Sequence, residues 1–121
     1  LYHLTSSNPK WRVRAERHLK KMGAVVVGAV LPYTKYPRWL VRAAAFRILG
    51  STGHASAVPA LFEGLADPVP MVREAALQGI RALTHCPLKF DPEAPIGARK
   101  KMLEEWRKYL LKRGFLPEHD P

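Results

Sequence analysis

The sequence predicts an all-α protein: a right-handed α-solenoid of antiparallel helical hairpins, ended by an amphipathic C-terminal capping helix. First, a motif of proline, Val-Arg and alanine recurs at a spacing of 28 and then 31 residues, which is room for two helices and two turns. Second, apolar residues inside each unit follow the helical period. Third, 121 residues with 47% hydrophobic content can bury one modest core, so we expect a single domain over 1–121.

The first helix of each unit opens with the recurring motif. It reads PKWRVRA from Pro9, PRWLVRA from Pro37 and PVPMVREA from Pro68. Proline suits the first turn of a helix, where its missing N–H would have had no partner. Asn8 and Asp67 precede two of these prolines and are expected to cap the helix amides. On the first helix, the expected inward face carries Trp11, Ala15, His18 or Leu19, and Met22.

The second helices lie between the motifs. The segment SAVPALFEGLAD, 56–67, places apolar residues at i, i+3, i+4 and i+7, which predicts a helix. The segment GAVVVGAVLP, 23–32, is ambiguous, because valines favour a strand and glycines weaken a helix. Its place in the repeat favours a helix, and an all-apolar helix would need cover on several sides.

The two ends of the chain depart from the repeat. Residues 1–8 can be aligned with LFEGLADP, so they are interpreted as the end of a preceding helix, in a piece of a longer solenoid or a chain lacking upstream residues. Repeats are then expected at 9–36, 37–67 and 68–113, followed by a tail at 114–121. Three prolines mark 85–97 as a loop. The helix after it should lay Trp106 on the last repeat and end at Gly114.

The stretch from Val41 to Leu83 resembles HEAT repeats of the short bacterial, PBS-lyase type. Val-Arg opens the first helix, Leu-Gly closes it, a proline lies near the start of the second, and Leu-x-Asp precedes the next unit. The resemblance is close over 37–83 and partial over 9–36. It implies that Arg42 and Arg73 form a structural ladder with Asp67, whereas Arg14 has no matching aspartate.

Charge is concentrated in the N-terminal part of the chain. The net charge is +10, and residues 1–50 hold ten Lys and Arg against the single acid Glu16. Such a field attracts an acidic partner. The predicted partner-binding face comprises Lys10, Arg12, Arg14, Arg17, Lys20, Lys21, Arg38 and Arg42.

This pattern favours a non-catalytic protein-interaction module, a scaffold or accessory subunit of a larger complex. The alternative is nucleic-acid binding along the same Lys/Arg stripe, and the simplest interpretation is a solvated face. Trp11 and Trp39 are expected to pack between repeats rather than to anchor a ligand.

No residue pattern predicts catalysis, a metal or a cofactor. His3, His18, His54, His85 and His119 are scattered and form no HxxxH or HExxH pair. The HEAT-like DNA glycosylases use a catalytic aspartate, for which Asp67 is the one candidate, but no other residue matches that family. Cys86 has no identifiable base. One cysteine leaves the compartment open, with the cytoplasm slightly favoured, and no apolar run is long enough to span a bilayer.

Overall fold

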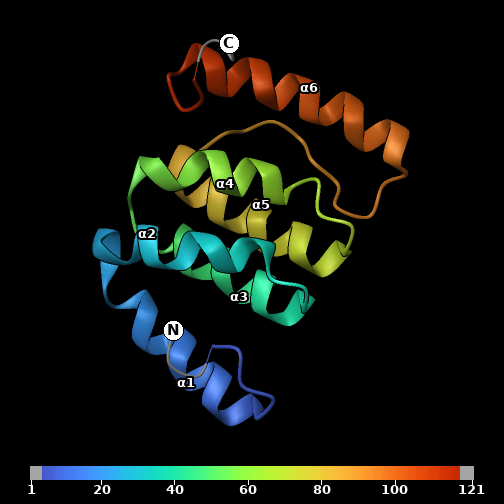
Figure 1. Ribbon diagram of the computed structural model, residues 1–121. Coiled ribbons are helices and arrows are strands. Elements are labelled where there is room, and N and C mark those ends of the chain that lie inside the picture. Colours follow the sequence, from blue (N-terminus) through green and yellow to red (C-terminus); the bar gives the residue numbers. More distant parts are fainter. Residues whose placement is uncertain (1–3, 118–121) are drawn as a thin grey trace.

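The computed structural model describes residues 4–117, and within that range all regular structure is helical, as Figure 1 shows. The all-α prediction is therefore confirmed. The α-helices are α1 (Pro9–Lys20), α2 (Val27–Val30), α3 (Trp39–Gly50), α4 (Val58–Gly64), α5 (Pro70–Thr84) and α6 (Ile96–Lys112). Short 3₁₀ helices are η1 (Gly23–Val26), η2 (Leu31–Lys35) and η3 (Ala55–Ala57).

The helices form two layers stacked along one direction. In Figure 1, α4 lies over α5 and α2 lies over α3, while α1 occupies one end of the stack and α6 the other. The helix α3 packs against α1 on one side and α5 on the other, and α4 contacts both α5 and η2. This is the arrangement of an α-solenoid, in which each unit is covered by its neighbours.

The helix starts differ from the prediction in two of the three units. The first helix does begin at Pro9, and Asn8 Oδ1 accepts a hydrogen bond from Lys10 N at 3.0 Å. However, α3 begins at Trp39 and α5 at Pro70, after the motif prolines. Asp67 binds the amide of Val69 (2.9 Å) outside the helix and not an amide of its first turn. In α5 the second proline, Pro70, explains the shift, because the residue before a proline, Val69, is held extended. In α3 no second proline follows, and the extended residue before the helix is Arg38.

The ambiguous segment at 23–32 is helical, as its position in the repeat predicts, but it is not one continuous helix. It alternates between η1, α2 and η2. Two glycines and Pro32 weaken a regular ladder of backbone hydrogen bonds. The expected cover on several sides is wrong. Val26, Val27 and Val30 are buried, whereas Val25 is 81% exposed.

The centre of the stack is a close crossing of α3 and α5 at two glycines. A Cβ added at Gly50 would lie 2.3 Å from Gly79 Cα, which no side chain can tolerate. A Cβ at Gly79 would in turn meet Leu61 of α4 at 2.9 Å. These contacts bring the helices together around a core that includes Val41, Ile48 and Ile80, all fully buried. The two glycines therefore set the spacing between the second and third units.

The terminal helix is held by the loop that precedes it, residues 85–95, which we call the strap. Side chains of α5 and α6 donate hydrogen bonds of 2.7–3.0 Å to its carbonyl groups: Arg73 to Pro92, Arg81 to Leu88, Arg99 to Ala94 and the Trp106 indole to Lys89. Burying these carbonyls without partners would be costly. The strap thus seats α6 on the last repeat.

The cap helix agrees with the prediction in detail. Trp106 is fully buried, and Gly114 has a φ of +80°, the left-handed conformation that ends many helices. The amide of Phe115 donates to the carbonyl of Leu110 at 2.9 Å, as in a Schellman motif.

The N-terminal residues were predicted to be the end of a preceding helix. Residues 1–3 lie outside the described range, and 4–8 form turns in which Leu4 is fully buried. The helix end therefore remains a prediction.

Candidate partner-binding surface

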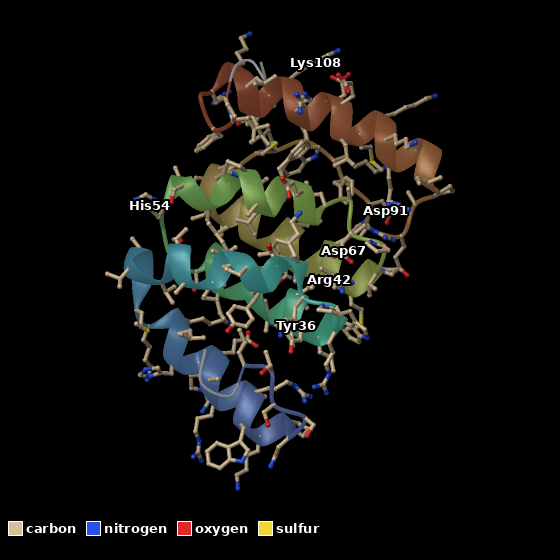
Figure 2. The ribbon with its side chains drawn as sticks, viewed as in Figure 1. Tyr36, Arg42, His54, Asp67, Asp91 and Lys108 are labelled. Carbon is tan, nitrogen blue, oxygen red and sulfur yellow. The ribbon has the colours of Figure 1, made fainter. Side chains whose placement is uncertain are left out.

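The predicted basic face divides into residues that the fold engages and residues that it leaves exposed. Arg42 belongs to the first group. Its guanidinium forms a bidentate pair with Asp67, Nε to Oδ2 at 2.8 Å and Nη2 to Oδ1 at 3.1 Å, and also donates to the carbonyls of Tyr36 and Pro37. Figure 2 shows Arg42 and Asp67 side by side, with Tyr36 near them. The hydrogen bonds of Asp67 raise the pKa of Arg42 despite its burial.

Arg73 extends this structural ladder in a different way. It is buried, and it donates to the main-chain carbonyl of Asp67 at 2.6 Å as well as to the strap. Burial, with the nearby charge of Arg99, lowers the pKa of Arg73. Both carboxylate oxygens of Asp67 are bonded, and its side chain is only 8% exposed. The contacts of Asp67 are thus those of a structural clamp.

Two further basic residues meet at one carbonyl group. Arg12 Nη1 donates to Ser6 O at 2.8 Å, and Arg38 Nη1 approaches the same oxygen at 3.3 Å. Both side chains are partly buried. These contacts tie the turns before α1 to the start of α3.

Glu16 joins α1 to α3. Arg47 makes a bidentate pair with it, at 2.6 and 2.9 Å, and Lys20 lies 3.2 Å away on the next helical turn. Burial alone would raise the pKa of Glu16, but the hydrogen bonds and charges of Arg47 and Lys20 hold this pKa below its ordinary value. In the sequence, Glu16 stands out only as the single acid of residues 1–50. That isolation among ten basic residues was the available signal that it is a shared acceptor.

Four residues of the predicted face are left over: Lys10, Arg14, Arg17 and Lys21. They lie on α1 or at its end, at the spacing i, i+4, i+7 and i+11, and all four are exposed. Within residues 4–117 none of their side chains makes a hydrogen bond or ion pair. Arg14 instead stacks on Trp11, with its guanidinium carbon 5.0 Å from the ring centroid, a cation–π contact. We call these four residues the α1 basic stripe.

The position of the stripe reflects a change in the buried face of α1. The helix α1 buries Ala15 and Leu19 and partly covers Arg12 and Glu16. In contrast, the side chains of Trp11 and Met22 are 39% and 41% exposed. The expectation that Trp11 packs between repeats is therefore wrong, although Trp39 is half-buried.

A position-by-position comparison with α3 shows the same change. Val13 is 53% exposed, whereas its counterparts Val41 and Val72 are fully buried. Within residues 4–117, no hydrogen bond or ion pair joins the side chain of Lys10 or Arg14 to the second unit. Instead Arg12 approaches Arg38 at Ser6 O, and Arg14 lies outside the Arg42–Arg73 ladder. Thus the side of α1 that matches the core side of α3 carries the stripe.

Other features of the surface give weaker candidates. A cavity of about 700 Å³ between α4 and α6 is lined by apolar residues such as Phe62 and Leu103 and by a balanced set of charges. No cluster of metal-binding side chains occurs among residues 4–117. In the same range, no helix has the length and apolar character needed to cross a membrane.

The geometry thus defines a class, an α-solenoid with an exposed cationic end. A family model described as HEAT repeats matches residues 1–83, about two thirds of the chain. The protein therefore belongs to the HEAT-repeat family, whose repeats generally serve protein interactions and are generally non-catalytic. Searches of curated proteins and of solved structures gave no match.

Proposed function

We propose that this protein is a non-catalytic interaction module, a scaffold or accessory subunit that holds an acidic protein partner on the α1 basic stripe. The observation that carries the proposal is that Lys10, Arg14, Arg17 and Lys21 are exposed and that none of these side chains is paired with an acidic residue within 4–117. Other basic residues of the N-terminal part are engaged by Ser6, Glu16, Glu63 or Asp67. The stripe is where positive charge is left for a partner.

The stripe also has a cost for the folded chain. Like charges three or four residues apart on a helix repel each other, and this repulsion destabilises α1. An acidic partner would remove the repulsion, whereas bulk solvent only screens it. The arrangement therefore suits a surface that is completed by binding.

Nucleic-acid binding is supported less well by the structure than by the sequence alone. The predicted cationic face spanned two repeats, but Arg12, Arg38 and Arg42 are engaged within the fold. The remaining stripe is one helix wide. A phosphate backbone that tracks a solenoid would be expected to contact cations on several successive units.

The experiment compares three forms of the full chain, expressed with a tag in the native source. These are the wild type, the double variant Arg14→Glu/Arg17→Glu, and the control Lys101→Glu/Lys112→Glu, which makes the same charge change on exposed residues of α6. We expect one acidic protein to co-purify stoichiometrically with the wild type and the control and to be lost from the stripe variant.

The same three forms are then passed over single- and double-stranded DNA between about 50 and 200 mM salt. The proposal expects retention that is weak and equal for the stripe variant and the control. Stripe-dependent retention on DNA without an acidic protein partner would contradict the proposal and favour the nucleic-acid alternative.

A further inference from the structure

The α1 basic stripe carries information about the shape of its partner as well as its charge. Residues at i, i+4, i+7 and i+11 lie in one row that extends for about 16 Å along the helix axis. Their spacing follows the helical repeat. A second helix with acids at the same spacing can lie alongside and pair with each cation, as charged positions do between helices of a coiled coil.

In the second and third repeats, the side of α3 and α5 that corresponds to the α1 basic stripe is covered by other helices. Val41, Ala45 and Leu49 of α3 are fully buried, as are Val72, Ala76 and Ile80 of α5. The helix α3 contacts α1, α2, η2, α4 and α5, all of them helical elements. On α1 the matching positions hold Val13, Arg17 and Lys21, which are exposed. Thus a side that the fold elsewhere covers with helices is open and cationic on α1.

Two apolar side chains border the stripe. Val13 lies on one side of it and Trp11 on the other, 53% and 39% exposed respectively. Trp11 also orders Arg14 through the cation–π contact, so that less side-chain entropy would be lost when Arg14 pairs with a carboxylate. A partner that offers acids with flanking apolar residues matches this surface better than a uniformly charged polymer does.

We infer that the α1 basic stripe is the docking site for an acidic amphipathic helix of the partner protein, which lies along α1 and pairs its carboxylates with Lys10, Arg14, Arg17 and Lys21. This inference rests on the proposed function and adds the class of the partner segment. No helix in residues 4–117 of a second copy meets the requirement. The acids that its cap helix exposes, Glu104 and Glu105, stand among Lys100, Lys101, Arg107 and Lys108.

The test uses the full chain and two fluorescent peptides of identical composition, each of about 15 residues. One carries four glutamates at i, i+4, i+7 and i+11 with leucines beside them on the same face. The other has the same residues permuted so that the glutamates are spread around the helix. A single-stranded oligonucleotide of similar charge is the third probe, and affinity is measured by fluorescence anisotropy at low and moderate salt.

We expect the patterned peptide to bind at least about tenfold more tightly than the permuted one. The preference should disappear in Arg14→Gln/Arg17→Gln and persist in the control Lys101→Gln/Lys112→Gln. If the two peptides bind equally and binding still depends on Arg14 and Arg17, the inference of a helical partner segment is overturned, whereas the proposal of an acidic partner stands. Tighter binding of the oligonucleotide than of either peptide would overturn both the helix and the proposed function.

Discussion

The helices α1 and α3 start from nearly the same sequence and end in opposite environments. Both contain Trp-x-Val-Arg-Ala at the same distance from a proline. Of 12 residues each, α3 buries seven and α1 only two, so the motif alone does not determine which side a helix turns to the core. Three later positions differ in character: α3 has Ala45, Ile48 and Leu49 where α1 has Arg17, Lys20 and Lys21. A repeat can therefore keep its opening motif and still face a partner.

The largest effect on stability is expected where α3 and α5 are packed most closely. Gly50→Ala should lower the free energy of unfolding by about 3 kcal/mol or more, because its Cβ would meet the backbone of Gly79 and force α3 and α5 apart. Urea denaturation followed by circular dichroism measures this. Gly28→Ala is the matched control, since a Cβ there meets nothing within 4 Å. A loss in the control as large as in Gly50→Ala would contradict the packing argument.

The next effect concerns the clamp between the second and third units. Asp67→Ala should cost about 2–4 kcal/mol, because it leaves the partly buried Arg42 without its bidentate partner. Glu63→Gln removes an exposed ion pair with Lys35 and should cost less than about 0.5 kcal/mol. Chemical denaturation of both variants gives the difference. Near-equal values would show that Asp67 is not a structural clamp.

A smaller effect is expected at low pH, where the contacts of Glu16 that hold α1 to α3 should be lost. The lowered pKa of Glu16 means that its contribution is present above the ordinary pKa of a glutamate and is lost as the pH falls below about 4. Acid should therefore release α1 before α3 and α5. Hydrogen exchange of the α1 amides as a function of pH measures this.

Glu16→Gln provides the comparison for that experiment. The variant should lose about 1 kcal/mol of α1 protection at neutral pH, a modest value because Arg47 is 42% exposed. It should also flatten the pH dependence of the α1 amides. An unchanged pH dependence in Glu16→Gln would assign the acid sensitivity to another group.

The smallest effect lies in the stripe itself. Arg17→Gln removes a repulsion with Lys21 on the next turn and no hydrogen bond, so the free energy of unfolding should stay constant or rise by up to about 0.5 kcal/mol. Thermal unfolding at low salt measures the change. A clear destabilisation would mean that Arg17 supports the fold, and it would weaken the case for a binding surface.

Much of this fold could be predicted because repeats encode it redundantly. The recurring motif, the apolar period and Gly114 each agree with the structure. The Arg42–Asp67 clamp followed from the resemblance to HEAT repeats, which supplied both partners. The start of α5 was predicted at Pro68 and lies at Pro70, because two prolines separated by one residue offered two equivalent first turns.

The candidate surface was predicted only in part. The sequence shows which residues are cationic, but the eight residues of the predicted partner-binding face differ in whether a hydrogen-bond acceptor lies near them in the fold. Arg12 and Arg38 bind a carbonyl, which carries no side-chain signature in the sequence. The orientation of α1 was missed because Trp11 and Met22 are large and apolar and were assigned to the core. The pairing of Glu16 with Arg47 required knowing how the helices stack.

Because of the strap, the two ends of the stack are expected to differ in how readily they detach under force. Four side-chain hydrogen bonds from two helices hold the strap, whereas α1 is joined to α3 chiefly through Glu16, two buried side chains and a shared carbonyl. If the molecule is pulled apart from both ends, α1 is expected to peel away at low force, while α6 stays attached until α5 itself unravels. A partner bound along α1 would therefore sit on the part of the protein that yields first under load.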